Sequence, residues 1–560
     1  MFMMFRQKYT EDRAVIHRTV KSISPLFAVL FLLVCVSASA VHPQSRSGVW
    51  IPDQGNGIYS NPVLHADYSD PDAIRVGDDF YLTSSSFQEV PGLPLLHSKD
   101  LVNWTIVGHA VERLGKEFDT PQHGKGIWAP SIRHHNGEFY IYYGDPDAGI
   151  FMVKAKKITG PWQKPVLVQK AKGMIDPCPL WDDDGNVYLV HAWAKSRAGF
   201  NSVLTVHRMD AEGTALLDSG TLVFDGHLKH PTIEGPKFYK RNGYYYIFAP
   251  AGGVKQGWQT VLRSRSPFGP YEDRIVMAQG TSTVNGPHQG AWIETATGDS
   301  WFMHFQDKGA YGRVVHLQPM IWKDNWPAIG RDVYGNGCGE PVLEFSKPVS
   351  GRNIPPAAPQ SADDFSSKTL GLQWQWNANP KDSWYSLTSK KGFLRLAAME
   401  RSGNSANLWE YPAVLLQKFP APEFTSTLKL SAANLKAGES FGFVVMGLDY
   451  SYIGCEKKGD SLSIVRALCE DAEKGIAELI EDSSSIPVGA IYLRIICRDG
   501  AVCTFSFSSD DKTYQTLGSL FTAREGQWIG ARIGVFCLRP AMVKKGGYVD
   551  LDWIHFEQVL

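Results

Sequence analysis

The chain has 560 residues, too many for one ordinary hydrophobic core, and this length predicts two or three domains. Its 56 Lys and Arg balance 57 Asp and Glu, so the formal net charge of -1 offers no basic surface to nucleic acid and no acidic surface to a polycation. The many Trp, Tyr and Phe, together with 53 Gly and 33 Pro, favour short strands and tight turns over long helices.

The N-terminus resembles a processing signal. Arg13, Arg18 and Lys21 precede an apolar run over residues 26–36, and the small residues of "SASA" follow it. This pattern predicts a signal peptide over residues 1–40, cleaved after Ala40, and a mature protein that is secreted or periplasmic and not attached to a membrane. A retained membrane anchor is the alternative, although the run has only about half of the roughly 20 residues that a spanning helix needs.

Removal of Cys35 leaves seven cysteines, an odd number that fixes no pairing. None of them forms a CxxC metal pattern. Export permits disulfides, but we expect mostly buried free thiols in strands, together with at most one or two bridges.

Five segments repeat one pattern, a turn followed by aromatic and β-branched residues. Asn-Gly and Asp-Gly are strong hairpin signals, so each segment predicts a tight turn that leads into a strand. The repeats lie 59, 48, 58 and 56 residues apart, which leaves room for one four-stranded sheet each. They are "GDDFYLTSS" from Gly77, "NGEFYIYYG" from Asn136, "DGNVYLVHA" from Asp184, "NGYYYIFAP" from Asn242 and "GDSWFMHFQ" from Gly298, aligned on Tyr81, Tyr140, Tyr188, Tyr246 and Phe302.

Five such units, with no strong amphipathic helix between them, predict an all-β domain: a five-bladed β-propeller over residues 50–345. In a propeller the strand before each hairpin is the innermost one. Residues at equivalent places in these strands should therefore converge on the central axis from different blades.

Each repeat carries a distinctive residue shortly before its aligned aromatic. These residues are Asp70 in "SDPD", Trp128 in "WAPS", Asp176 in "IDPC", Glu234 in "IEGP" and His288 in "NGPHQG", at offsets of 11, 12, 12, 12 and 14. Taken alone, the acidic cluster of Asp67, Asp70 and Asp72 around Pro71 is typical of a solvated turn. The repeat instead gathers Asp70, Asp176 and Glu234 in one pocket, where their repulsion favours a metal site or proton chemistry.

A carboxylate pair that activates water and protonates a leaving oxygen is the machinery of glycoside hydrolysis, and aromatic faces stack on sugars. The third acid can hold the general acid protonated through like-charge repulsion. A neutral, polyhydroxylated substrate also fits the charge balance. Core packing is the alternative for each candidate platform: Phe87, Trp128, Trp193 and Trp258.

Several motifs carry a family resemblance: "NPVLHADYSDPDAIRVGDDFYL", "HSKDLVNW", "WAPSI", "MIDPCPLWDDDGNVYL" and "EGPKFYKRNGYYYIFA". Together, over about residues 58–345, they resemble the five-bladed propeller hydrolases of glycoside hydrolase family 43. The resemblance implies that Asp70 is the general base, Asp176 the acid that tunes and orients, and Glu234 the general acid of an inverting displacement. It also implies exo-acting cleavage of terminal xylose or arabinose.

Further site residues follow from the same resemblance. His288 is similar to the family's axial histidine, often found beside a calcium ion, and Arg313 in "YGRVVHLQP" to a substrate-pocket arginine. Trp128 resembles a pocket wall. A buried core histidine and a structural ion pair are the alternatives for His288 and Arg313. No redox or nucleotide cofactor is implied, because "APAGGVKQG" lacks the spacing and the following helix of a phosphate-binding loop.

A Pro-, Ser- and Ala-rich linker over residues 346–362 separates a second domain, residues 363–560. Alternating strands such as "STLKLSA" and "AIYLRIICR" predict a β-sandwich, and "DDFSSKTLGLQWQWNANP" and "VDLDWIHFEQ" resemble the concanavalin A-like domain of xylosidase-type members. Two roles stay open: the sandwich completes the catalytic pocket, or it is a detached carbohydrate-binding module.

The sequence therefore predicts an exported exo-glycosidase that removes terminal pentoses from plant polysaccharides or oligosaccharides. The alternatives are a non-catalytic sugar-binding propeller and a family relative that acts on arabinan or galactan. A fructan-cleaving propeller would need motifs such as "RDP" and "EC", which this sequence lacks.

Overall fold

The computed structural model describes residues 49–349, 353–401, 406–486 and 489–559, which belong to one compact unit. The predicted signal peptide, residues 1–40, lies outside the described residues. Within them the chain is almost entirely β-structure, and no helix is both long and apolar enough to cross a bilayer. The short helical segments are η1 (Lys116–Asp119), α1 (Lys195–Ala198), η2 (Gly309–Tyr311), η3 (Ala472–Lys474) and η4 (Asp499–Ala501).

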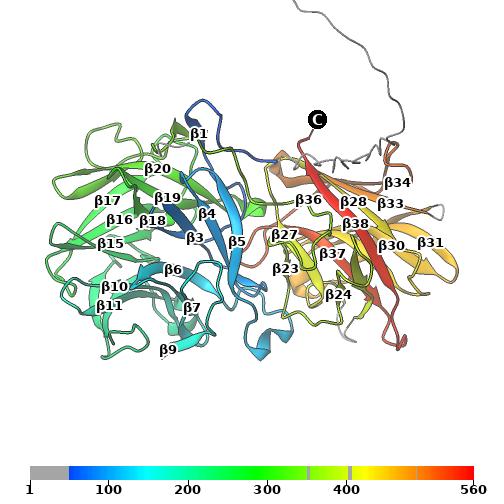
Figure 1. Cartoon of the computed structure of the whole chain (residues 1–560), viewed down its shortest axis with the longest axis horizontal. Helices are drawn as coiled ribbons and strands as arrows, with labels where there is room; N and C mark the ends of the chain where they lie inside the picture. The colour runs from blue at the N-terminus through cyan, green and yellow to red at the C-terminus, as the bar shows by residue number, and fades with distance from the viewer. Residues whose placement is uncertain (1–48, 350–352, 402–405, 487–488, 560) are drawn as a thin grey trace, which may run out of the picture. The chain divides into compact units, whose positions relative to one another are not determined.

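Residues 72–329 form five four-stranded antiparallel sheets, each made of strands consecutive in the sequence, so the predicted five-bladed propeller is confirmed (Figure 1). The blades are β2 (Asp72–Val76), β3 (Asp79–Thr83), β4 (Gly92–Ser98) and β5 (Trp104–Val111); β6 (Trp128–His135), β7 (Glu138–Asp145), β8 (Gly149–Ala155) and β9 (Val166–Lys170); β10 (Met174–Trp181), β11 (Val187–Trp193), β12 (Val203–Met209) and β13 (Thr221–Asp225); β14 (Lys237–Arg241), β15 (Tyr244–Ala251), β16 (Trp258–Ser264) and β17 (Glu272–Ala278); β18 (His288–Glu294), β19 (Ser300–Asp307), β20 (Arg313–Lys323) and β21 (Trp326–Ile329).

The first strand of each blade is the innermost, as the repeat predicts. Strand β2 contacts β6, β6 contacts β10 and β10 contacts β14, while β18 of the last blade contacts β2 and closes the ring. Outside the blades, β1 (Ile58–Ser60) pairs with β22 (Glu344–Ser346), which ties the two ends of the propeller together. The start of every innermost strand therefore faces a common central region.

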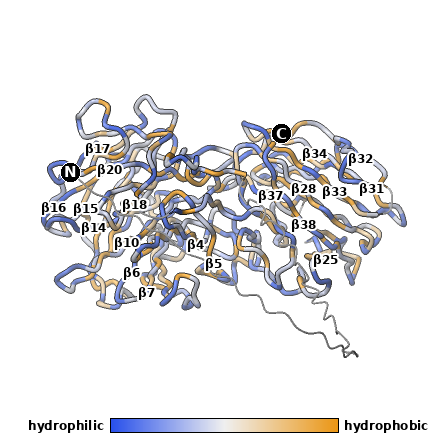
Figure 2. The backbone as a smooth tube through the Cα atoms, turned by 45° about the horizontal axis from the view of Figure 1, so that its top comes forward, coloured by the Kyte–Doolittle hydropathy of each residue, from blue (hydrophilic) through white to orange (hydrophobic). Residues whose placement is uncertain are grey.

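Aromatic residues at the aligned repeat position fill the space between blades. Tyr246 and Phe302 are fully buried, and they share one hydrophobic cluster with Phe248 and Trp326. Burial of each such side chain contributes about 1.5–3 kcal/mol. Hydrophobic and hydrophilic stretches alternate along the tube in Figure 2, as expected for strands with one side in the core.

The second domain is the predicted β-sandwich, formed by two eight-stranded sheets among the described residues. One sheet contains β23 (Gln375–Trp376), β26 (Met399–Glu400), β27 (Val414–Lys418), β29 (Ser440–Met446), β30 (Tyr450–Lys458), β31 (Ser461–Cys469), β32 (Leu479–Ser485) and β37 (Arg532–Arg539). The other contains β24 (Tyr385–Ser386), β25 (Leu394–Ala397), β28 (Phe424–Ser431), β33 (Ile491–Arg498), β34 (Val502–Ser508), β35 (Gln515–Thr516), β36 (Phe521–Thr522) and β38 (Tyr548–Glu557).

The sandwich is joined to the first blade by hydrogen bonds. Val90 and Trp376 exchange two backbone hydrogen bonds, of 3.0 and 2.6 Å. The buried Asn379 side chain accepts a hydrogen bond from the backbone N–H of Leu114 and donates to the backbone oxygens of Leu114 and Gly115 and to Asp119. The alternative of a detached module does not describe this structure.

The seven cysteines that follow Cys35 are free thiols in the described structure, and six of them are buried. Cys497 and Cys503 lie opposite each other on β33 and β34. The expectation of mostly buried free thiols is confirmed, and the described residues contain none of the one or two bridges that it allowed.

Candidate active site

The residues singled out by the repeat lie at the start of the innermost strands, where the backbone is irregular. Asp70 and Asp176 have φ of 54° and 57°, the left-handed region that non-glycine residues rarely adopt. The sheet register shifts between Ile175 and Cys178 and again between His288 and Gly290. Bulges and positive φ values are common at functional sites because they redirect side chains out of the regular pleat.

The Asp70 carboxylate is buried and accepts several strong hydrogen bonds. Ser85 Oγ donates to it at 2.6 Å and Ser69 Oγ at 3.1 Å, while a guanidinium nitrogen of Arg313 lies 3.0 Å from its Oδ1. The same nitrogen donates to Ser69 Oγ at 2.7 Å. Charge-assisted bonds of this kind are shorter and stronger than those between neutral groups, so they fix the orientation of the Asp70 carboxylate.

Asp176 and Glu234 form the second half of the site. Asp176 is buried and accepts the backbone N–H of Gly235 at 2.7 Å, which links it to the residue after Glu234. Burial, and after it the charges of Asp176 and Asp70, raises the pKa of Glu234 to about 8. Burial also raises the pKa of Asp176, with Asp70 adding to the effect. The structure thus brings Asp70, Asp176 and Glu234 together, and Glu234 is the best placed of them to hold a proton near neutral pH.

Glu234 is also the one that solvent reaches, because 30 % of its side chain is exposed. A proton held there is accessible to a bound molecule.

His288 lies beside Glu234, with Nε2 3.4 Å from Oε1. Its side chain is fully buried, which lowers the pKa to about 3, so the imidazole is neutral in the working range of most enzymes. Neither ring nitrogen has a hydrogen-bond partner among the described residues. Two unsatisfied buried nitrogens fit a site in which a bound water or hydrated ion supplies the missing partners.

The half-buried indole of Trp128 stands at the start of β6, the innermost strand of the second blade. Its Nε1 donates to the Gly124 carbonyl at 3.0 Å, and the Arg197 guanidinium lies 5.5 Å from its ring. Phe87 contacts its edge with ring centroids 6.3 Å apart, but Phe87 is only 3 % exposed and has little surface left for a sugar. Trp128 is therefore the more open platform of the two.

Trp193 and Trp258 are half-buried, each with its indole N–H already bonded. Trp193 donates to Thr205 Oγ1 at 3.0 Å and packs on Phe200, while Trp258 donates to His230 at 3.2 Å. These contacts do not join either side chain to the three carboxylates.

The sandwich domain contributes a residue that the repeat did not predict. Trp528 is 48 % exposed, has φ of 67° and packs edge-on against Trp128 with ring centroids 6.2 Å apart. A large aromatic held exposed in a strained conformation suggests a contact role rather than a core role. The lone tryptophan of "GQW" was the only sequence signal, and nothing in it pointed to the propeller.

The other two members of the acidic cluster around Pro71, Asp67 and Asp72, lie elsewhere. Asp72 accepts the Ile132 backbone N–H at 2.8 Å and pairs with Arg133 at 2.7 Å, so it ties the first blade to the second. Asp67 faces the sandwich and pairs with Arg532 at 2.9 Å. Only Asp70 of the three joins the site.

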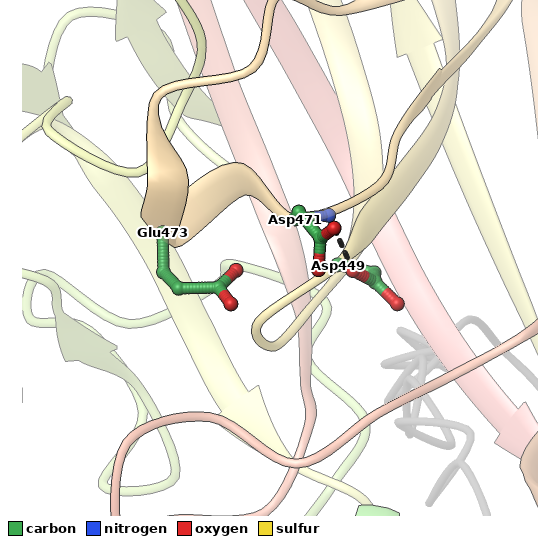
Figure 3. A group of neighbouring side chains, drawn as sticks. All are labelled: Asp449, Asp471 and Glu473. Carbon is green, nitrogen blue, oxygen red and sulfur yellow. Dashed lines mark hydrogen bonds between the residues drawn. The ribbon is translucent and has the colours of Figure 1, made fainter.

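One further acidic group lies in the sandwich, where Asp449, Asp471 and Glu473 bring oxygens close together (Figure 3). Arg524 contacts Asp449 at 2.9 Å and Asp471 at 3.2 Å, and Lys474 contacts Asp471 at 3.0 Å. These cations already compensate the carboxylates, so the group is best described as a surface ion-pair network.

Relatives share both domains. A protein from Xylanibacter ruminicola is 41 % identical over 498 residues, which cover 88 % of each chain. A beta-xylosidase from Formosa agariphila is 32 % identical over 95 % of this chain and 97 % of its own length. A non-reducing end alpha-L-arabinofuranosidase from Bacteroides ovatus is 31 % identical over 91 % and 97 %.

Among solved structures, the GH43 protein BlXynB from Bacillus licheniformis superimposes with a TM-score of 0.76 at 25 % identity. The match covers 90 % of this chain and all of that one. Residues 59–327 match the model of glycosyl hydrolases family 43, and residues 362–557 match the beta xylosidase C-terminal concanavalin A-like domain. Because the propeller matches this family model and the relatives above are similar over both domains, the chain belongs to glycosyl hydrolases family 43 and is a glycoside hydrolase.

Proposed function

We propose that this protein is an exo-acting hydrolase that releases terminal xylose or arabinose from plant cell-wall polysaccharides or oligosaccharides, as a β-xylosidase, an α-L-arabinofuranosidase or both. The pocket's charge distribution carries the proposal: Asp70 is surrounded by donors, whereas burial and repulsion raise the pKa of Glu234. Relatives named for each of the two activities support this substrate class.

The roles of the three acids follow from these surroundings. As water attacks the anomeric carbon, Asp70 accepts its proton, and Glu234 gives its own proton to the oxygen that leaves when the glycosidic bond breaks. Besides burial, the negative charge of Asp176, when that group is ionised, helps to keep Glu234 protonated, and its bond from Gly235 N–H fixes the two residues relative to each other. A single displacement of this kind inverts the anomeric configuration.

The surrounding side chains would hold the sugar. Trp128 and Trp528 offer aromatic surface at the rim, with Phe87 behind Trp128 as support, and the Arg313 guanidinium beside Asp70 can donate to a sugar hydroxyl. The relative named a non-reducing end alpha-L-arabinofuranosidase supports attack at a chain end rather than in the middle of a polymer.

Two alternatives to this function make different demands on the site. A sugar-binding propeller without catalysis would have no use for three mutually repelling carboxylates, so the raised pKa of Glu234 disfavours it. A family relative acting on arabinan or galactan would use the same acids with a differently shaped rim.

We propose further that no organic cofactor takes part and that a structural calcium ion lies near His288. No group of three acidic, His or Cys ligand atoms gathers at His288 among the described residues, so such an ion would be held largely through water. Such an ion would lie close to Glu234 and would help to hold the surrounding side chains in place.

We also propose that the protein is exported, and is secreted or periplasmic after cleavage of residues 1–40. The basic residues, short apolar run and small residues of that segment support this, and a polymeric substrate outside the cell fits it.

The reaction class can be tested with aryl glycosides whose leaving groups still need protonation. We expect turnover of the β-xylopyranoside, the α-arabinofuranoside or both, with little turnover of the α-arabinopyranoside and β-galactopyranoside. Glu234→Ala and Asp70→Asn should each lower kcat by at least about 1,000-fold with the fold intact by circular dichroism, because each removes a proton-transfer group. Asp183→Asn, at an exposed hairpin turn, should leave kcat unchanged.

Hydrolysis by either variant at the wild-type rate would contradict the assigned roles. If the wild-type protein hydrolyses none of the four glycosides but binds xylan or arabinan, the sugar-binding alternative would be favoured. Proton NMR of the first product formed should show the inverted anomer, and release of the retained anomer would refute the single displacement.

The alkaline side of the pH profile should report Glu234. Because the acid must be protonated, kcat/KM falls as pH rises through its pKa, and Asp176→Asn removes a negative charge that raises that pKa. The alkaline limb should therefore move to lower pH, by about one unit. An unchanged limb in Asp176→Asn, with Asp183→Asn as the control, would show that Asp176 does not tune Glu234.

Chelation tests the cation. Treatment with EDTA should lower Tm, and added Ca²⁺ should restore it, because an ion bound only by the folded state stabilises that state. A His288→Ala variant should have lost most of this response. A Tm that is the same before and after chelation would remove the calcium proposal.

Export can be tested by producing the full chain in a Gram-negative host and sequencing the N-terminus of the released protein. We expect Val41 as the first residue. An intact N-terminus that fractionates with membranes would support the retained anchor instead.

A further inference from the structure

The sandwich domain contributes a buried arginine to the propeller, with a side chain 3 % exposed at the start of β37. The guanidinium of Arg532 makes two bonds to Glu89, of 2.8 and 3.0 Å, and one of 2.9 Å to Asp67 Oδ2. Both acids belong to the first blade region and are almost fully buried. Lys418 of β27 lies 4.0 Å from Glu89, so two cations from the sandwich balance two acids from the propeller.

Asp67 connects Arg532 to Arg313 of the candidate site through hydrogen bonds. Its Oδ1 accepts the backbone N–H of Arg313 at 2.8 Å, and its Oδ2 accepts the backbone N–H of Gly530 at 3.0 Å. The Arg313 side chain in turn lies on Asp70, three residues after Asp67. Asp67 and Asp70 therefore hold the two ends of one residue, its backbone and its guanidinium.

The sandwich also holds the segment that leads into Arg313. The Ala531 N–H donates to the Ala310 carbonyl at 2.7 Å, and the Tyr311 hydroxyl donates to the Pro422 carbonyl and accepts the Ala501 N–H. The Asp67 carboxyl group packs so closely on Gly312 that a Cβ there would lie 2.4 Å from its carbon, and a Cβ on Gly530 would lie 2.6 Å from the Gly312 nitrogen.

We propose that Arg532 is a positioning residue for catalysis: through Asp67 it fixes the backbone of Arg313 and so sets the Arg313 guanidinium on the Asp70 carboxylate. Arg532 itself is buried away from solvent and does not touch the substrate. The proposal rests on the proposed role of Asp70. If Arg532 has this role, the second domain supports the catalytic centre through buried charges. This support does not depend on the contact between Trp528 and Trp128.

The alternative is that Arg532 only holds the domains together. A loss of stability would follow from either role, so kinetics must separate them. Displacing a catalytic contact by a fraction of an ångström lowers the rate of the chemical step, whereas weakening an interface far from the centre lowers Tm without changing kcat.

The test uses the full chain and the pentoside that the wild-type enzyme hydrolyses. Arg532→Lys keeps the charge, which limits the loss of stability, but a single ammonium cannot bond Glu89 twice and Asp67 at once. We expect kcat to fall about 10- to 100-fold with KM changed less than about 3-fold.

The control is Asn379→Ala, which removes four hydrogen bonds between the domains through residues 114–119 rather than through Asp67. It should lower Tm and leave kcat unchanged.

A double-mutant cycle identifies the route. If Arg532 acts through Arg313, Arg532→Lys should lower kcat by less than about 3-fold in an Arg313→Lys background, because the contact it sets is already disturbed. If Arg532→Lys does not fold, Asp67→Asn takes its place with the same expected non-additivity.

Two results would overturn the proposal: wild-type kcat in Arg532→Lys despite a lower Tm, or a full additive loss of kcat in the Arg313→Lys background. A wild-type protein that turns over no pentoside would instead refute the proposed function, and the two failures are thereby distinguished.

Discussion

Asp70, Asp176 and Glu234 lie close enough to repel one another, and their surroundings compensate this repulsion unequally. Arg313 compensates Asp70 directly, at 3.0 Å, while the backbone N–H of Gly235 stabilises Asp176. Glu234 lies next to a neutral imidazole, and burial and repulsion raise its pKa. The site thus surrounds Asp70 with hydrogen-bond donors and raises the pKa of Glu234, a difference that fits the acid and base roles we propose for them.

Such a cluster needs a rigid frame, because three carboxylates that repel one another would otherwise move apart. The propeller supplies it: each acid stands at the inner end of a different blade, and aromatic residues such as Tyr246 and Phe302 pack between blades without solvent. Positive φ at Asp70 and Asp176 turns these side chains out of the sheet pleat. The hydrogen-bonded strands that follow Asp70 and Asp176 offset the energetic cost of these positive φ values.

The second domain has a larger part in this centre than its position in the sequence suggests. Trp528 forms part of the rim beside Trp128, and Arg532 contacts the acid that holds the Arg313 backbone. Both residues lie close together at or just before β37, so one segment of the sandwich reaches the rim and the support of the pocket. These contacts connect the two domains at the candidate site, although they are separate in sequence.

The propeller, its five repeats and the meeting of Asp70, Asp176 and Glu234 could be predicted from the sequence, because hairpin turns and aromatic strands recur at regular spacing and equivalent offsets reach equivalent places. It also indicated the sandwich and Arg313 through resemblance. The burial of Phe87, the different interfaces of Asp67 and Asp72, and the contacts of Trp528 with Trp128 and of Arg532 with Asp67 emerged only from the three-dimensional fold. These assignments depend on contacts such as that between Arg532 and Asp67, which join residues 465 positions apart and leave no periodic pattern along the chain.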